Sequence, residues 1–251
     1  MTQQSNKPNS AFILAAGLGK RLRPYTDKVP KPLVPVNGRP ILDYTLDKLR
    51  ADGVEHVTMN LNYLGEKIQD YYADTREPNI TFSPEDELLD TGGGVKKALD
   101  TMQGDAFYLI NGDALWEDGP DETTLERLTE KWNPETMDIL LLLQPVQAMT
   151  LTQGVGDYDI DSDGRAIRSL DQTGQYMFGG IRISKKNIFD GTVEGEAFSY
   201  LQLMDKAQAA GRLHAVVHDG EWHHISTPAD LDRVNEAMKS SECPQPNKKA
   251  V

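Results

Sequence analysis

The first 143 residues alternate between short apolar runs and segments whose apolar residues recur every three or four positions. The first pattern is typical of buried strands and the second of amphipathic helices. Their alternation predicts βαβ units and an α/β fold with a mostly parallel central sheet. The predicted strands are residues 11–16, 54–61, 80–83, 106–110 and 137–143, and the predicted helices are residues 40–51, 64–72, 93–102 and 121–132.

The pattern changes after Gln144. Two short runs, residues 155–160 and 166–170, flank a polar turn and predict an antiparallel hairpin. We interpret the hairpin and the strand that follows it as an insertion that forms a lid over a substrate. The elements predicted after the hairpin are a strand at 175–183, a helix at 198–210, a strand at 213–218 and a helix at 227–239.

Composition indicates one soluble, cytoplasmic domain. Residues 10–239 are predicted to form it, and the polar residues 1–9 and 240–251 are expected to be disordered or loose. No apolar run is long enough to span a bilayer, and the start of the chain lacks the apolar segment of a signal peptide. The net charge of −13 disfavours nucleic acid as a partner. The single cysteine, Cys243, excludes an intrachain disulfide and a thiolate metal cluster.

A cationic loop follows the first predicted strand. Gly17-Leu18-Gly19 interrupts the apolar run, and five cations follow within twelve residues, namely Lys20, Arg21, Arg23, Lys28 and Lys31. Glycines at a strand end let backbone N–H groups approach a phosphate. The loop is not a dinucleotide fingerprint, because position 22 is Leu, and it is not a P-loop, because Arg21 follows Gly19-Lys20. The pattern predicts an anionic ligand.

Asp113 is the first candidate for a metal ligand. It follows the apolar run 106–110 in the sequence Asn111-Gly112-Asp113. The carboxyl ends of parallel strands meet at one edge of a sheet, so Asp113 is expected to face the cationic loop. A carboxylate beside bound phosphates suits Mg²⁺. The alternative is that Asp113 is a turn residue, because Asn-Gly-Asp is also favourable turn chemistry.

Two linked motifs resemble those of sugar-1-phosphate nucleotidyltransferases. Residues 14–24 match L-A-A-G-x-G-x-R-L-x-P, and residues 30–33 match P-K-P-L. The resemblance implies a Rossmann-like three-layer nucleotidyltransferase fold with a small antiparallel insertion on the sugar side. It divides the domain into a nucleotide-binding half, about 10–143, and a sugar-binding half, about 144–239. It also implies Mg²⁺-dependent transfer of a nucleotidyl group from a nucleoside triphosphate to a sugar 1-phosphate, with release of pyrophosphate, by a monomer or homodimer.

The resemblance also implies site residues. Arg21, Lys31 and Asp113 are expected to be catalytic, with Arg21 on the leaving pyrophosphate and Lys31 near the α-phosphate and the sugar phosphate. Asp113 is expected to bind the metal. The nucleotide is expected to contact Ala15, Ala16, Gly17, Gly19, Lys20, Arg21, Glu85, Asp90, Thr91, Gly92 and Gly93, and the sugar phosphate is expected to contact Lys31, Asn111, Gly180 and Glu196.

The finer resemblance concerns residues 87–94 and 111–113. They are most similar to N-acetylmuramate-1-phosphate uridylyltransferases of peptidoglycan recycling, with mannose-1-phosphate guanylyltransferases as the near alternative. The base is open, because Glu85 could accept the N3–H of uracil or two hydrogen bonds from guanine. UTP is favoured. A flexible helix lead-in is the alternative interpretation of the glycines at 92–94.

One departure from the family concerns the metal site. Many relatives carry Trp-x-Asp-x-Gly-Thr-Pro near the C-terminus, whereas residues 222–228 place His224 at the Asp position and Ser226 at the Gly position. Imidazole is a poor magnesium ligand. His224 could contact a phosphate or water while Asp113 holds Mg²⁺, it could change the metal preference, or the protein could be a non-catalytic nucleotide-sugar binding module. A purely structural histidine is the fourth interpretation.

Overall fold

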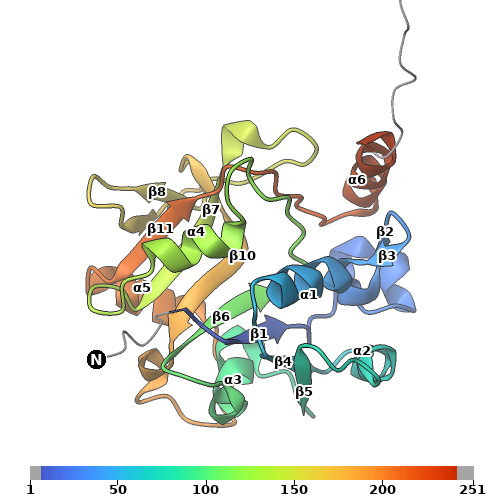
Figure 1. Cartoon of the computed structure of the whole chain (residues 1–251), viewed down its shortest axis with the longest axis horizontal. Helices are drawn as coiled ribbons and strands as arrows, with labels where there is room; N and C mark the ends of the chain where they lie inside the picture. The colour runs from blue at the N-terminus through green and yellow to red at the C-terminus, as the bar shows by residue number, and fades with distance from the viewer. Residues whose placement is uncertain (1–6, 242–251) are drawn as a thin grey trace, which may run out of the picture.

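The computed structural model describes residues 7–241 and contains a nine-stranded sheet with helices on both faces (Figure 1). The main path of the sheet runs in the order β11-β7-β10-β6-β1-β4-β5, in which every neighbouring pair is parallel except the two pairs that β10 makes. The predicted α/β fold with a mostly parallel sheet is confirmed.

The elements have the following bounds. The strands on the main path are β1 (Ser10–Leu14), β4 (His56–Leu61), β5 (Asn79–Pro84), β6 (Ala106–Asn111), β7 (Ile139–Pro145), β10 (Tyr176–Lys185) and β11 (Leu213–Val217). The hairpin β8 (Tyr158–Ile160) and β9 (Ala166–Arg168) joins the same sheet, and β2 (Pro35–Val36) pairs with β3 (Arg39–Pro40). The helices are α1 (Ile41–Ala51), α2 (Gly65–Tyr72), α3 (Asp90–Lys97), α4 (Thr124–Lys131), α5 (Leu201–Ala209) and α6 (Pro228–Ser241).

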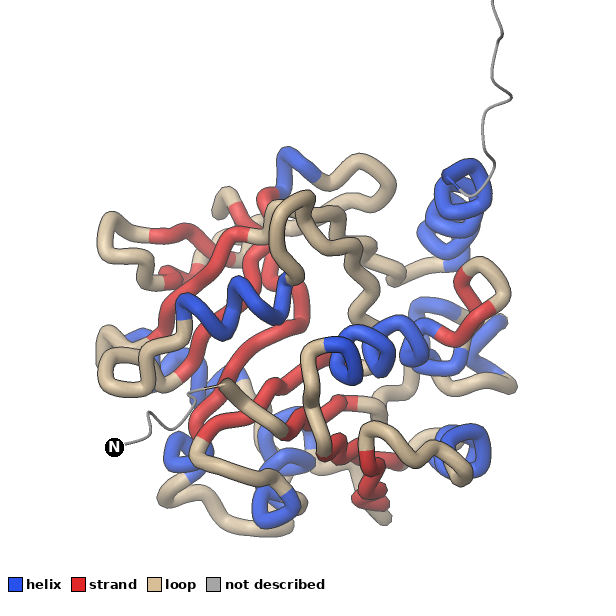
Figure 2. Tube along the Cα trace, in the orientation of Figure 1, coloured by secondary structure: helices blue, strands red, loops and turns tan. Residues whose placement is uncertain are grey.

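The alternation of β1 shows how the layers form, because successive side chains of a strand face opposite sides of a sheet. Ala11 and Ile13 lie in the core that also contains the apolar residues of α1, α2 and α4. Phe12 lies in the second core, with those of α3 and α5. Helices therefore cover both faces of the sheet (Figure 2). No helix in the described part of the chain is long and apolar enough to cross a membrane.

Strand β10 departs from the predicted insertion. It extends over ten residues and lies in the middle of the sheet, antiparallel to β6 on one side and to β7 on the other. Only the short hairpin β8–β9 remains at the side of the main path. An apolar strand pattern reveals burial but not the neighbour that will pair with it, and this is why the sequence placed β10 in the lid.

Several predicted boundaries shift. Helix α3 begins at Asp90, so its glycines lie inside it. Helix α4 begins after Thr123, whose side chain forms a reciprocal capping box with Glu126. Residues 7–9 are held in place, because Lys7 pairs with Asp52 at 2.8 Å and the carbonyl of Asn9 accepts from the Glu55 amide. Residues 1–6 and 242–251 lie outside the described residues, so the prediction that they are disordered or loose stays a prediction.

Candidate active site

The cationic loop leaves the carboxyl end of β1 and folds tightly on itself. Gly19 has a φ of 58°, in the left-handed region, and a Cβ there would lie 2.9 Å from Cγ2 of the buried Thr26. The hydroxyl of Thr26 donates to the Gly19 carbonyl at 2.8 Å. The loop therefore requires glycine at this point for both conformation and space. The 3-10 helix η1 (Lys20–Leu22) follows at once.

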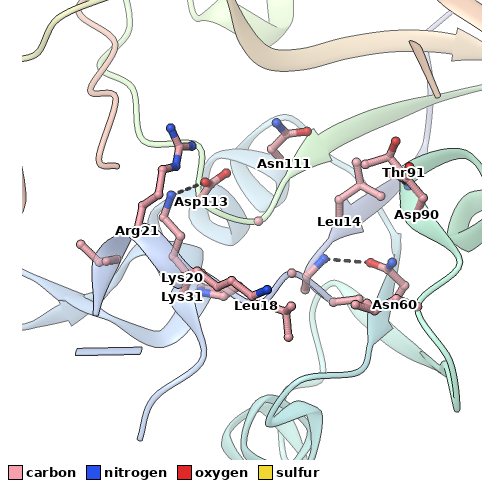
Figure 3. A pocket seen from close by; sticks show the side chains of 18 of the residues that line it. Leu14, Leu18, Lys20, Arg21, Lys31, Asn60, Asp90, Thr91, Asn111 and Asp113 are labelled. Carbon is pink, nitrogen blue, oxygen red and sulfur yellow. Dashed lines mark hydrogen bonds and ion pairs between the residues drawn. The ribbon is translucent and has the colours of Figure 1, made fainter. Parts of the chain in front are cut away.

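A cavity of about 660 Å³ lies between this loop, the end of β6 and the start of α3 (Figure 3). Arg21, Lys31 and Asp113 gather on one side of it, and Asp90 and Thr91 lie on the other. The structure thus brings together side chains that about ninety residues of sequence separate, because β1 and β6 are parallel neighbours. The predicted site residues that line this cavity are Ala15, Ala16, Gly17, Gly19, Lys20, Arg21, Lys31, Glu85, Asp90, Thr91, Asn111 and Asp113.

Lys31 and Asp113 form an ion pair in this cavity. The Lys31 Nζ lies 2.5 Å from Oδ2 of Asp113, and the carboxylate is half-buried. Burial alone would raise the pKa of Asp113, but the charge and hydrogen bond of Lys31 outweigh it, and the pKa is lowered. Asp113 is therefore an ionised carboxylate at neutral pH, able to act as an oxygen ligand. The neighbouring Lys31 can exchange its contact with Asp113 for a contact with a phosphate.

Glu85 does not present a free carboxylate to the cavity. Its Oε1 accepts from Nδ2 of Asn60 at 2.8 Å, and its Oε2 accepts from the Leu89 amide at 3.0 Å. The Asn60 Oδ1 in turn accepts from the Ala15 amide at 2.8 Å. This network joins the cationic loop to the segment before α3. The sequence analysis missed Asn60, although a polar residue at the end of an apolar strand was the available signal.

Five predicted residues do not line the first cavity, namely Gly92, Gly93, Gly180, Glu196 and His224. Gly92 and Gly93 are buried in α3, where the chain at 196–198 passes so close that a Cβ on Gly92 would lie 2.2 Å from the Phe198 ring. The carbonyl of Phe198 accepts from the Gly92 amide at 2.8 Å. These glycines therefore admit another segment of the protein rather than a ligand. Glu196 is exposed in that segment and lines neither of the two cavities described here.

A second cavity of about 350 Å³ adjoins the first, and Thr91 and Asn111 line both. The second cavity lies between β10, the hairpin β8–β9 and the start of α5. Gly180 packs on the Asn111 side chain, since a Cβ there would meet Nδ2 at 2.8 Å, but it lines neither cavity. Two connected hollows are an arrangement that can hold two substrates, or one substrate with two parts.

His224 lies close enough to the ion pair for the charges of Lys31 and Asp113 to affect its pKa. Backbone contacts between Glu117 and Glu221 and between Leu115 and His223 lay its segment beside the chain that follows β6. Its ring stacks on Trp222, with centroids 5.3 Å apart. Burial lowers the pKa of His224, as do the charges of Lys31 and Arg21, while Asp113 opposes them. His224 is thus a neutral imidazole at neutral pH, and which of its four interpretations holds stays a prediction.

The donor set for a metal is small. Among residues 7–241, no three His, Cys, Asp or Glu side chains are grouped so that they could hold a metal ion. Asp113 is a hard oxygen ligand of the kind Mg²⁺ prefers, and substrate phosphates commonly supply further ligands. The site therefore fits Mg²⁺ that arrives with a triphosphate better than a metal caged by protein alone.

The model of the family described as nucleotidyl transferase matches residues 10–240. The chain belongs to this family. An N-acetylmuramate alpha-1-phosphate uridylyltransferase of Caulobacter vibrioides is 31% identical over 230 residues, covering 89% of this chain and 94% of that protein. A D-glycero-alpha-D-manno-heptose 1-phosphate guanylyltransferase of Aneurinibacillus thermoaerophilus is 28% identical, covering 91% and 98%.

The nucleotidyl transferase fold is also seen in a solved relative. The crystal structure of HddC from Yersinia pseudotuberculosis complexed with GMP-PN has a TM-score of 0.73 and 27% sequence identity, covering 91% of this chain and 99% of that one. The chain is therefore a nucleotidyltransferase of the class that acts on sugar 1-phosphates, as its two linked motifs predict.

Proposed function

We propose that the chain is a cytoplasmic, Mg²⁺-dependent enzyme that transfers a uridylyl group from UTP to N-acetylmuramic acid 1-phosphate in peptidoglycan recycling. The observation that carries the proposal is the pair of connected cavities, with the Lys31–Asp113 pair and the cationic loop in the first. The uridylyltransferase of Caulobacter vibrioides, at 31% identity, supports the choice of substrates.

The proposed reaction needs no covalent intermediate on the protein. A phosphate oxygen of the sugar 1-phosphate attacks the α-phosphorus of UTP, the bond to the β-phosphate oxygen breaks, and pyrophosphate leaves. Catalysis would then be positioning and neutralisation of negative charge. The cavity arrangement supports this assignment, because the triphosphate would occupy the cationic loop and the sugar would extend past Asn111 into the second cavity.

The proposed roles of the charged side chains are consistent with their places in the first cavity. Arg21 is exposed at the mouth of the first cavity, where its planar guanidinium would bind oxygens of the leaving pyrophosphate. Lys31 would donate to the α-phosphate and the incoming sugar phosphate once its hydrogen bond to Asp113 is released. Asp113 would hold Mg²⁺, which when bound supplies positive charge to the phosphates. His224 would contact a phosphate or water beside them.

The state of Glu85 supports uracil over guanine at the base. Guanine could present two donors to a carboxylate, but both oxygens of Glu85 already accept hydrogen bonds and the side chain is 5% exposed. Double recognition of guanine through this residue would therefore require the buried side chain to turn toward the cavity, which would disturb its hydrogen bonds with Asn60 and the Leu89 amide. Uracil would offer this carboxylate only its N3–H, so its recognition would require a smaller rearrangement of Glu85.

Pyrophosphate release tests the proposal. UTP, GTP, CTP and dTTP would each be combined with the 1-phosphates of N-acetylmuramic acid, N-acetylglucosamine, mannose and glucose, in the presence of Mg²⁺. We expect turnover with UTP and the muramic sugar. Turnover with GTP and mannose 1-phosphate would contradict the substrate assignment. No release from any pair, with a nucleotide-induced rise in melting temperature, would instead favour a non-catalytic nucleotide-sugar binding module.

A further inference from the structure

The second cavity contains a buried cation that the proposed reaction does not use. Arg182, on β10, lines this cavity and is 2% exposed. Its Nε is buried and has no hydrogen-bond partner among the described residues. Within residues 7–241, no carboxylate lies within ion-pair distance of its guanidinium. A buried guanidinium cannot discharge its proton, so an unpaired one is unfavourable unless something else compensates it.

Aromatic rings give part of that compensation. The guanidinium carbon lies 4.3 Å from the centroid of the Tyr200 ring and 5.2 Å from that of Phe178. Rings in these positions stabilise and orient a guanidinium, but they do not replace the hydrogen-bond acceptors that water provided. The arrangement holds the donors of Arg182 in a fixed place and leaves the Nε–H unpaired.

The other charged groups of this cavity already have partners. Nη1 of Arg168 lies 2.7 Å from each carboxylate oxygen of Asp205. Oδ2 of Asp157 accepts from the Phe178 amide at 3.2 Å, and burial raises the pKa of this carboxyl. Asp157 can accept a hydrogen bond from a sugar hydroxyl. Arg182, by contrast, is a cation of this cavity that forms no ion pair with any of the described residues.

We propose that Arg182 determines sugar specificity by binding a carboxylate carried by the sugar. The inference rests on the proposed function for the identity of the sugar. N-acetylmuramic acid differs from N-acetylglucosamine by a lactyl ether, which bears a carboxylate, on the ring. The sugar phosphate itself must lie in the first cavity, beside Lys31, to react there. The second anion of the same substrate is therefore the group that reaches Arg182.

The contacts of Tyr200 link the surroundings of Arg182 to the wall of the first cavity. The Tyr200 amide donates to Oγ1 of Thr91 at 2.9 Å, and Thr91 lines both cavities. The Tyr200 hydroxyl donates to Oγ of Ser184, two residues beyond Arg182, at 2.7 Å. The Tyr200 ring is thus held over the guanidinium by one hydrogen bond at its backbone and another at its hydroxyl.

Arg182→Gln tests the proposal, with the two sugar 1-phosphates compared under saturating UTP. We expect kcat/KM for N-acetylmuramic acid 1-phosphate to fall by roughly 10²-fold, and that for N-acetylglucosamine 1-phosphate to change by less than about threefold. Arg168→Gln is the matched control, because it removes a paired arginine from the same cavity and should keep the ratio between the sugars. An equal fall for both sugars would assign Arg182 to the phosphate, and no change in either would make it structural; each result overturns the proposal.

A second measurement uses the unaltered protein and does not depend on turnover. Calorimetric titration would compare free N-acetylmuramic acid with its methyl ester, which keeps the shape of the lactyl group and removes its charge. We expect the ester to bind at least tenfold more weakly, and equal affinity would overturn the proposal. If UTP and the muramic sugar 1-phosphate give no pyrophosphate, the proposed function fails, whereas this titration still decides whether a carboxylate is bound.

Discussion

The two connected cavities treat charge in opposite ways. In the first, the buried charged groups have partners, with Lys31 on Asp113 and Glu85 held by Asn60 and the Leu89 amide, and the cations Lys20 and Arg21 are exposed to solvent. In the second, Arg182 is buried against aromatic rings, and no carboxylate of residues 7–241 forms an ion pair with it. The first cavity can therefore stand empty at little electrostatic cost, while the second is completed by an anion from outside.

This difference separates the shared part of the reaction from the selective part. A triphosphate is highly charged and can displace internal partners, so the first cavity needs only cations and backbone donors that become available on binding. Discrimination between similar sugars needs a group that is left unsatisfied by the wrong one. The comparison predicts that changes in the first cavity affect every substrate pair, and that changes in the second affect some.

The largest expected effect is that of Asp113→Asn. The substitution keeps the size of the side chain and removes its charge, so it replaces the anionic oxygen that we propose as the Mg²⁺ ligand by a neutral one and weakens the pairing with Lys31. We expect kcat to fall by on the order of 10³-fold with every sugar 1-phosphate, measured by pyrophosphate release. A melting temperature close to that of the unaltered protein would show that the fold is kept. Activity within tenfold of the original would contradict the role of Asp113.

The next effect contrasts Lys31→Met with Lys20→Met. Lys31 is mostly buried, with 12% of its side chain exposed, and is aimed at Asp113, whereas Lys20 is exposed on the rim of the same cavity. We expect Lys31→Met to lower kcat by roughly 10²-fold, because the charge acts on the reacting phosphates. Lys20→Met should instead raise KM for the nucleotide by less than about tenfold. Steady-state kinetics with the nucleotide varied would distinguish them, and equal effects on kcat would count against the assignment.

A stability effect follows from the contact between α3 and residues 196–198. Gly92→Ala would place a Cβ 2.8 Å from the Phe198 carbonyl as well as against its ring. We expect a loss of about 1–3 kcal/mol, because this overpacking outweighs the helix propensity that Ala adds. Gly17→Ala is the control, since nothing lies within 4 Å of a Cβ there, and its stability should change by less than about 0.5 kcal/mol. Urea unfolding of both variants would measure the difference, and equal midpoints would disprove the packing argument.

The smallest expected effect concerns His218, a buried basic side chain that, unlike Arg182, can lose its proton. Burial lowers the pKa of His218, and a backbone hydrogen bond at Glu221 offsets only part of the shift. A lowered folded pKa means that the unfolded chain binds the proton more readily, so stability is full above 6.5 and falls as the pH drops through and below that value. We expect the free energy of unfolding to decrease from about pH 7.5 to 5.5, and to decrease less in His218→Gln. Identical pH profiles in the two proteins would refute this role of His218.

The sequence predicted the first cavity better than the second for a physical reason. The cationic loop and its lysine lie within one continuous stretch, and the position of Asp113 follows from the rule that parallel strands end at one edge. Asn60 and Arg182 reach their sites through strand pairings that no local pattern specifies, and neither was predicted. Gly92 and Gly93 were assigned to the nucleotide because glycine permits close approach equally to a ligand or to the chain itself.

Strand β10 fixes the distance between the two ends of the proposed substrate site. Arg182 is paired with Leu109 of β6 on one side and Leu141 of β7 on the other, and Asp113 lies four residues beyond Leu109. The interval between the reacting centre and the sugar-reading arginine is thus set by backbone ladders rather than by movable side chains. A substrate whose two anionic ends are spaced differently cannot be accommodated by a change of rotamer. Substitutions along β10 would then alter which sugars are accepted, while the groups that carry out the transfer, which follow β1 and β6, are unchanged.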